Sequence, residues 1–303
     1  GDRGANAYGR FALENPQELR FVAVAETQPE RRKQFAANHH IPEERCFPSW
    51  KQALAAGKIA DVVINATQDA THYPSGMAAL EAGYDMLLEK PIAPNLADAV
   101  ALTLTAERLG RKLMIGHVLR YTEFFEALGE VIQSGALGQL VTLSWRENVG
   151  AYHMAHSYVR GNWRSTRDSA PMLLAKCCHD LDLLTWYLRE PITSLASTGS
   201  LLHFRPENAP AGAPARCTDG CPAALECPFY APAIYRDMLP IKYTLLHSEH
   251  PSIRWLGKAV LRAPGSIPTL DKLLPGQPLS RALHAWPRSV ITNDPESDEA
   301  VMQ

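Results

Sequence analysis

The sequence has 303 residues, of which 46% are hydrophobic and 20% charged, and its formal net charge is -2. This composition is typical of a globular protein with enough apolar residues for a core and enough length for two domains. The small net charge argues against a nucleic-acid partner, and no apolar run is long enough to span a membrane. Six cysteines, two of them adjacent, do not form a secreted disulfide framework, so we expect a cytoplasmic protein.

The first residues carry part of a dinucleotide-binding pattern. Gly1, Arg3 and Gly4 open a predicted helix, and Glu26 follows a strand predicted over 21–25. In a complete motif the glycines let the backbone approach a pyrophosphate at a helix N-terminus, and the acidic residue binds the adenosine ribose. A simple helix-opening turn and a strand-end charge explain these residues equally well.

Strands and helices alternate through the first 117 residues. Further strands are predicted at 46–47, 61–66, 84–89 and 112–116, and the helices that separate them at 29–38, 50–57, 73–82 and 96–109. This alternation indicates βαβ units and a parallel sheet, whose strands end at one ligand-binding edge. We therefore expect a dinucleotide-binding domain whose cofactor-binding residues are Gly1, Arg3, Gly4, Glu26, Thr67, His72, Glu89 and Lys90, with Thr67 and His72 in the loop after the strand at 61–66.

Lys90 stands at the end of a buried strand, between Glu89 and Pro91. Proline fixes the φ angle of the turn, and such a peptide bond can be locked in the cis form. The ammonium group is then aimed at the ligand edge, where it can bind a substrate hydroxyl or stabilise negative charge. An ordinary strand end with a surface ion pair to Glu89 is the competing interpretation.

The second half begins with a predicted helix at 124–134 and a strand at 140–148 that has one polar face. The loop that follows contains His153, His156 and Trp163 among other polar and aromatic residues. Such a loop suits a hydroxyl-rich or anionic ligand, and it suits an ordinary surface loop as well.

Residues 172–188 have the pattern of a helix with two faces. One face groups His179, Asp182 and Trp186. The other is an apolar stripe of Leu173, Cys177, Leu181, Leu184 and Leu188. Histidine accepts protons near neutral pH, and a nearby carboxylate can hold its tautomer, so this helix can line a cleft. A surface histidine capped by an aspartate is the alternative.

Beyond residue 195 the chain is irregular and rich in proline. Cys217, Cys221 and Cys227 lie close together in the sequence, and three such thiols bind zinc when a fourth ligand is present. The spacing is not that of a standard zinc finger, and redox-active or small buried thiols fit as well. We expect the three to cluster and assign no metal. Residues 253–285 look helical in part and yield no chemistry.

Several of these motifs recur together in one known family. Their order along the chain is Gly1-x-Arg3-Gly4, Glu26, the loop from Thr67 to His72, Glu89-Lys90-Pro91, Arg120-Tyr121 and His179-Asp180. In this the chain resembles the Gfo/Idh/MocA oxidoreductases, from residue 1 to about residue 200 and more loosely to the end. The resemblance implies a Rossmann-type parallel-sheet domain (1–117) followed by an α/β domain with an open, mostly antiparallel sheet that mediates oligomers (118–303). It also implies that Lys90 lies by the nicotinamide and the substrate and that His179 transfers a proton.

The chain departs from the family pattern in three ways. We expect it to lack the first strand and first glycine of the fingerprint, and most of the C-terminal sheet. The absent strand would lie between those ending at Glu26 and Ala66, so we expect the chain alone to be unstable or to aggregate. Many members carry an aspartate four residues before the catalytic histidine, where this sequence has Ala175. Lys176 and Asp182 are the candidates for its role.

The resemblance implies an NAD(P)-dependent dehydrogenase that moves a hydride between a sugar, cyclitol or similar polyol and the nicotinamide cofactor. The expected catalytic residues are Lys90 and His179. The expected substrate-binding residues are Arg120, His153, His156, Lys176 and Asp182. An NAD-dependent glycosidase-like enzyme with transient oxidation and a non-catalytic dinucleotide-binding regulator are the alternatives. Stoichiometric NADH formation would exclude the first, and turnover would count against the second.

The acidic residue predicts the choice of cofactor. Glu26 should repel the 2′-phosphate of NADP, so we expect tighter binding of NAD, although Arg31 and Arg32 would soften the preference by pairing with that phosphate. Titrating both cofactors into the protein measures the difference. Clearly tighter binding of NADP would contradict the assignment.

Overall fold

The computed structural model describes residues 1, 3–150, 153–167 and 169–238. The chain divides into two compact units, one formed by Gly1–Glu147 with Ser165–Thr193 and the other by Asn148–Arg164 with Ser194–Gln303. The domain boundary expected after residue 117 stays a prediction.

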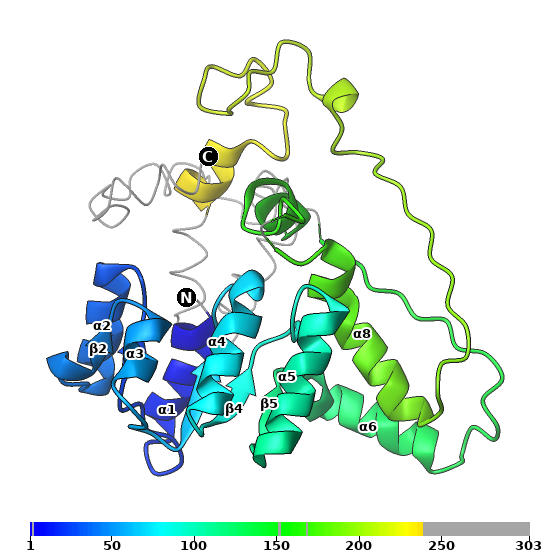
Figure 1. Cartoon of the computed structure of the whole chain (residues 1–303). Helices are drawn as coiled ribbons and strands as arrows, with labels where there is room; N and C mark the ends of the chain where they lie inside the picture. The colour runs from blue at the N-terminus through cyan, green and yellow to red at the C-terminus, as the bar shows by residue number, and fades with distance from the viewer. Residues whose placement is uncertain (2, 151–152, 168, 239–303) are drawn as a thin grey trace, which may run out of the picture. The chain divides into compact units, whose positions relative to one another are not determined.

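The first unit alternates helices and strands (Figure 1). Its strands are β1 (Val24–Ala25), β2 (Cys46–Phe47), β3 (Val62–Asn65), β4 (Asp85–Leu88) and β5 (Leu113–Ile115). Its α-helices are α1 (Arg10–Glu14), α2 (Pro29–His39), α3 (Trp50–Ala55), α4 (Asp69–Glu81), α5 (Leu96–Leu109), α6 (Glu123–Gln133) and α8 (Met172–Leu188). Shorter helical turns are η1 (Arg3–Gly9), η2 (Glu43–Arg45) and η3 (Val118–Tyr121).

All strand pairs of this unit are parallel, as the alternation predicts. β1 pairs with β2, and β3, β4 and β5 form a second sheet in that order. Within it Leu88 lies opposite both Asn65 of β3 and Ile115 of β5, so the three strands end at the same level. The residues that follow these strands therefore emerge at one edge of the sheet.

The helix that follows β4 shows why the local sequence folds as it does. The side chain of Asn95 accepts a hydrogen bond from the Asp98 N–H and satisfies one of the free donors at the start of α5. Gly110 ends the helix in the left-handed conformation, with φ of 62°, which glycine adopts at little cost. The predicted bounds of this helix are confirmed.

The core of the unit lies between the β3–β4–β5 sheet and the helices α4 and α5. Leu80 of α4, Leu88 of β4 and Leu102 of α5 are each 0% exposed and belong to one cluster. Gly76 of α4 also faces this cluster, where a Cβ atom would lie 2.9 Å from Leu102 Cδ2. This packing fixes α4 against the sheet and so fixes the first turn of α4 relative to the strand ends.

Several predicted elements differ from the structure. β1 has two residues in place of the five predicted, and within the described chain β1 and β3 are not paired with each other. Residues 140–148 form no strand, because no other described segment pairs with them. The loop predicted after residue 148 contains a π-helical turn, η4 (Met154–Arg160). The helix α4 begins at Asp69, so His72 lies in a helix and not in a loop.

The predicted apolar stripe of α8 is wrong. Leu173, Leu181 and Leu188 are 59%, 44% and 42% exposed. The helix packs on a neighbouring face, where Leu183 and Tyr187 are buried and the Tyr187 hydroxyl donates to the Phe125 carbonyl of α6. Residues four apart share a helix face, so this buried face also carries His179.

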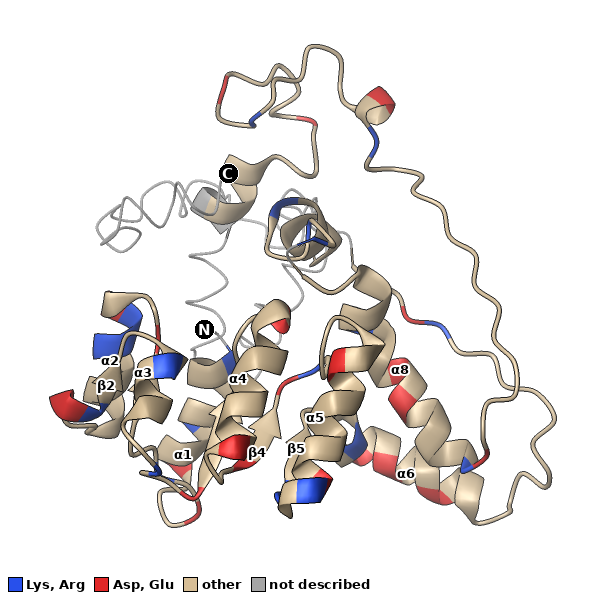
Figure 2. Ribbon diagram, in the orientation of Figure 1, with Lys and Arg blue, Asp and Glu red and all other residues tan. Residues whose placement is uncertain are grey.

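The second unit contains η4, η5 (Pro206–Asn208) and η6 (Ala233–Met238) among its described residues. The residues 253–285 that were predicted to be partly helical lie outside the described part. Figure 2 shows that acidic and basic residues both occur along the helices, in keeping with the small net charge. None of the helices described is both long and apolar enough to cross a membrane.

The core predicts how two leucines of α5 should differ. Leu102→Ala should lower the free energy of unfolding by about 2–5 kcal/mol, because it leaves a cavity in the cluster. Leu104→Ala, in the same helix at a position that is 57% exposed, should change it by less than about 1 kcal/mol. Urea unfolding of both variants measures the difference. Equal losses would show that this cluster is not the core of the unit.

Candidate active site

The loop after β4 places a carboxylate and an ammonium group in different surroundings. Glu89 is 7% exposed, and its carboxylate accepts a 2.7 Å hydrogen bond from the Tyr8 hydroxyl and lies 3.4 Å from Arg3 Nε. The Lys90 ammonium instead donates a 2.7 Å hydrogen bond to the carbonyl of Ala175 on α8. The structure therefore does not contain the surface ion pair between Glu89 and Lys90 that was the competing interpretation.

Lys90 is joined to α8 one helical turn before His179. Ala175 and His179 are four residues apart and share the buried face of the helix. Burial lowers the pKa of His179 to about 4, with the positive charges of Lys90, His117 and Lys176 acting in the same direction. At neutral pH the imidazole is neutral and can accept a proton.

A second histidine, His117, lies beside His179 at the end of β5. The two rings meet edge to face, with centroids 5.8 Å apart. Burial lowers the pKa of His117 too, against the opposite effect of Asp182, whose Oδ2 lies 3.9 Å from His117 Nδ1. The Nδ1 atoms of both histidines are buried without a hydrogen-bond partner among the described residues. The pair thus presents unsatisfied polar atoms next to Lys90, as a site for a polar ligand requires.

Asp182 is held by Arg120 and not by His179. Arg120 Nε donates a 2.7 Å hydrogen bond to Asp182 Oδ2, and Arg120 Nη2 donates another of 2.7 Å to Asp182 Oδ1. The guanidinium also lies over the Trp186 ring, 5.6 Å from its centroid. This fork raises the pKa of Arg120, mainly through the hydrogen bond to Asp182. The carboxylate expected to orient the histidine instead fixes the arginine.

Lys176 is paired as well. Its Nζ lies 3.1 Å from Glu147 Oε1, so its charge is balanced by that carboxylate. Lys176 and Asp182, the candidates for the missing aspartate, therefore each have a partner other than His179. Next to the histidine, Cys178 has its pKa raised to about 11 by burial, against the lowering effect of Lys90.

The predicted cofactor-binding residues lie at the strand ends of the first unit. Glu26 follows β1 and accepts hydrogen bonds from the Gly1 amino group and the Gln28 N–H. A Cβ atom on Gly4 would lie 3.7 Å from the Ala66 side chain after β3, and the contact of Arg3 with Glu89 extends to β4. Backbone and carboxylate groups thus gather along the edge of both sheets.

The side chains of two predicted cofactor-binding residues already contact polar groups of the protein. The Thr67 hydroxyl donates to Asn65 Oδ1 at 2.8 Å. His72 is 1% exposed, and both of its ring nitrogens face backbone carbonyls. Both ring nitrogens of this buried side chain therefore already face protein groups, and the part of His72 in cofactor binding stays a prediction. The sequence showed its position after a strand but not its burial.

His153 and His156, predicted to bind substrate, belong to the second unit. His153 stacks on Tyr158 with ring centroids 6.0 Å apart, and His156 Nδ1 lies 2.7 Å from the Tyr235 hydroxyl. Their part in substrate binding stays a prediction.

The cysteines of the second unit are not gathered as expected. In the part of the chain that the structure describes, no group of three or more His, Cys, Asp or Glu residues is placed to hold a metal ion. Cys217, Cys221 and Cys227 all remain partly exposed. They lie on successive turns, which separate side chains that are close in the sequence.

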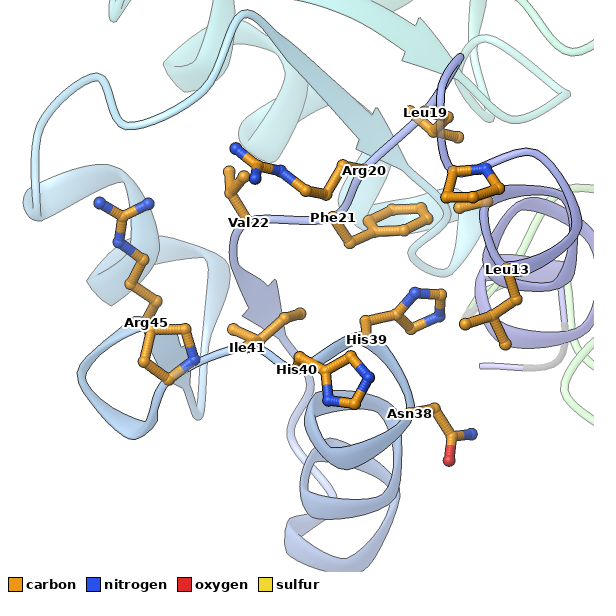
Figure 3. A pocket seen from close by; sticks show the side chains of 13 residues that line it. Leu13, Leu19, Arg20, Phe21, Val22, Asn38, His39, His40, Ile41 and Arg45 are labelled. Atoms are coloured by element: carbon orange, nitrogen blue, oxygen red, sulfur yellow. The ribbon is translucent and has the colours of Figure 1, made fainter.

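A cavity of about 550 Å³ lies in another part of the first unit (Figure 3). In its wall the rings of Phe21 and His39 are in edge-to-face contact, with centroids 5.1 Å apart. It is lined by residues of 12–22 and 38–45 and by none of the candidate site residues. It is therefore separate from the Lys90–His179 site.

Comparison with known proteins identifies the fold. The model of an oxidoreductase family with an NAD-binding Rossmann fold, Gfo/Idh/MocA, matches residues 3–117, and the model of the C-terminal domain of the same family matches residues 125–245. The chain belongs to the Gfo/Idh/MocA oxidoreductase family. The predicted resemblance is confirmed, as is the Rossmann-type parallel fold of the N-terminal part. The open antiparallel sheet expected after residue 117 is not found among the described residues.

Members of the Gfo/Idh/MocA family similar to this chain include dehydrogenases. Inositol 2-dehydrogenase 4 of Saccharopolyspora erythraea is 28% identical over 193 residues, which are 63% of this chain and 52% of the relative. The putative oxidoreductase YteT of Bacillus subtilis is 26% identical over 179 residues, 58% of this chain and 41% of the relative. The chain thus spans about half the length of the curated relatives it matches.

A solved Gfo/Idh/MocA structure shows the same fold. The WlbA dehydrogenase from Bordetella pertussis, solved in complex with NADH and UDP-GlcNAcA, matches with a TM-score of 0.51 and 22% identity. The match covers 62% of this chain and 53% of that protein. At this identity the likeness concerns the fold alone.

The strand ends also include a residue that the sequence analysis missed. His117 follows β5 directly, at the same edge as the residues after β3 and β4. Its position at the carboxyl end of a parallel strand was a usable signal. Glu147 and Tyr8 were missed too, and only the three-dimensional contacts mark them.

The lowered pKa values predict how stability depends on pH. When the chain unfolds, His117 and His179 regain ordinary pKa values near 6.5. As the pH falls through this value toward 4, the unfolded state binds protons that the folded state does not, so stability should decrease. The free energy of unfolding, measured in urea between pH 7.5 and 5, should fall less steeply for His179→Asn than for the parent. An unchanged slope would show that His179 is not held neutral.

Proposed function

We propose that the protein is an NAD-dependent dehydrogenase that oxidises a secondary alcohol of a sugar, cyclitol or similar polyol. The observation that supports this proposal most is the position of Lys90. Its ammonium group is hydrogen-bonded to Ala175, one turn of α8 before His179, whose imidazole has a lowered pKa. The inositol dehydrogenase among the similar proteins supports a cyclic polyol as the substrate class.

The residues at the strand ends fit a dinucleotide. The buried nitrogens of His117 and His179, which have no hydrogen-bond partner among the described residues, leave polar groups for it. Gly1, Gly4 and Glu26 would hold the pyrophosphate and adenosine ribose, and Lys90 would lie by the nicotinamide. Bound NAD supplies the hydride acceptor.

His179 then serves as the general base. Its neutral ring accepts the proton of the substrate hydroxyl while the carbon that bears this hydroxyl gives up a hydride, and the alcohol becomes a carbonyl. Because burial and neighbouring cations disfavour the imidazolium, the proton is passed on readily to water. His117 faces the same place and limits the free rotation of the His179 ring.

Lys90 orients the reacting oxygen. An ammonium group has three donors, and the Ala175 carbonyl uses one of them. A second donor can bind the substrate oxygen and stabilise the negative charge that develops on it as the proton leaves. The Arg120–Asp182 fork and the Lys176–Glu147 pair then offer charged groups to the other hydroxyls of the substrate.

The wider assignments belong to the same proposal. NAD is preferred to NADP because of Glu26, the protein acts in the cytoplasm, and it works as a homo-oligomer. A regulator that binds dinucleotide without turnover is the outcome that would replace this function.

The function predicts separate effects on catalysis and on cofactor binding. Lys90→Met keeps the apolar stem but removes the donors, so kcat should fall about 10²–10³-fold. The Kd for NAD, which depends on the glycines and Glu26, should change much less. Steady-state kinetics with a panel of polyols and a cofactor titration measure the two quantities.

Lys112→Met provides the control. This exposed lysine directly precedes β5 and so lies at the N-terminal ends of the strands, away from the residues that follow them. Its loss should therefore leave kcat unchanged. His179→Ala should also be impaired, and the double variant with Lys90→Met should be little worse than either single one if the two residues act as a unit. A near-normal rate for Lys90→Met would remove Lys90 from the site, and no turnover by the parent would favour the regulator.

A further inference from the structure

His72 occupies a buried position directly behind the loop that carries Lys90. It lies in the first turn of α4 and is 1% exposed. Its Nδ1 is 2.7 Å from the carbonyl oxygen of Pro91, and its Nε2 is 3.1 Å from that of Thr67. The one side chain therefore touches the backbone after β3 and the backbone after β4.

The shorter of these contacts fixes the backbone next to the lysine. A carbonyl oxygen only accepts and a neutral ring has one N–H, so only one of the two contacts is a hydrogen bond. We assign the hydrogen to Nδ1, on the shorter contact, so that the ring donates to Pro91. Pro91 has no N–H and follows Lys90 directly, so this bond restrains the chain at the point from which the lysine side chain departs. A buried carbonyl without a donor is costly, which keeps the bond formed.

The same turn of α4 also reaches α8. Asp69, 3% exposed, accepts a hydrogen bond from the N–H of Ala170 at 3.3 Å, just before the helix that carries His179. Lys90 closes the connection by its bond to Ala175. The first turn of α4 is thus bonded to both parts of the site, while α4 itself is held by the core around Leu80.

We propose that His72 is a positioning residue that sets the place of the Lys90 ammonium through its hydrogen bond to the Pro91 carbonyl. The catalytic part of this inference rests on the proposed function. The placement of Lys90 does not, because it is a property of the folded chain.

Two substitutions separate the two ring positions. The amide nitrogen of asparagine occupies nearly the place of the histidine Nδ1, and that of glutamine nearly the place of Nε2. His72→Asn therefore keeps the donor to Pro91, and His72→Gln places a donor near Thr67 in its stead. Both variants replace the buried ring by a smaller amide with one donor near a carbonyl, so a purely structural role predicts similar effects for the two.

Kinetics give the first readout. His72→Gln should lower kcat about 10–100-fold, since a displacement of about 1 Å in a reacting group costs up to about 100-fold. The Kd for NAD should stay near that of the parent. His72→Asn should keep kcat within about threefold. Equal losses of kcat in both variants would overturn the proposal.

The second readout does not need turnover. Trace acetylation with acetic anhydride, followed by mass spectrometry, measures the reactivity of Lys90 against Lys112 as an internal reference. In His72→Gln the Lys90 amine should react faster than in the parent, because its bond to Ala175 is loosened, and in His72→Asn it should not. If the parent lacks dehydrogenase activity but this difference is found, the positioning role stands and the proposed function fails. If Lys90 reacts alike in all three proteins, the positioning role fails.

A cavity variant keeps the test possible if His72→Gln does not fold. In His72→Ala, added imidazole should enter the vacated space and restore slow acetylation of Lys90. Because 1-methylimidazole has no N–H to donate to Pro91, it should not. Equal restoration by both compounds would show that filling the space, and not the hydrogen bond, is what matters.

Discussion

The hydrogen bond between the Lys90 ammonium and the Ala175 carbonyl joins the two elements of the candidate site. Lys90 comes from the edge of a parallel sheet and Ala175 from a helix 85 residues further along the chain. Without this bond the loop after β4 and the helix α8 would have no charged contact in common. Burial is the main cause of the low pKa of His179, and the Lys90 ammonium acts in the same direction.

The charges around this bond are arranged so that positive groups act on the histidines while the negative ones are occupied elsewhere. Glu89 is bound by Tyr8 and Arg3, Asp182 by Arg120, and Glu147 by Lys176. Asp182, although bound by Arg120, still acts against the lowered pKa of both histidines. Burial outweighs it, so both rings keep lowered pKa values.

The sequence predicts those features that depend on local pattern. The alternation of short apolar runs with amphipathic segments predicts β2 and α5 to the residue, because their lengths follow from caps, glycines and burial. Lys90 and His179 were found for the same reason: one ends a buried strand, and the other lies in a group of polar residues three and four apart on a predicted helix.

Features that need a partner far along the chain were not predictable in this way. Residues 140–148 alternate like a strand, yet a strand forms only where another pairs with it. The side of α8 that is buried was misjudged, because Leu173 and Leu183 look alike until the packing against α6 is known. His72 could be placed after a strand, but the carbonyls that surround it come from two other segments.

The thiol beside His179 shows what this arrangement means for reactivity. Thiolates, and not thiols, attack electrophiles and are oxidised. Lys90 lies close enough to favour a thiolate at Cys178, but burial dominates and raises the pKa of the thiol to about 11. Cys178, directly adjacent to His179, is therefore expected to react slowly with alkylating agents and peroxide at neutral pH.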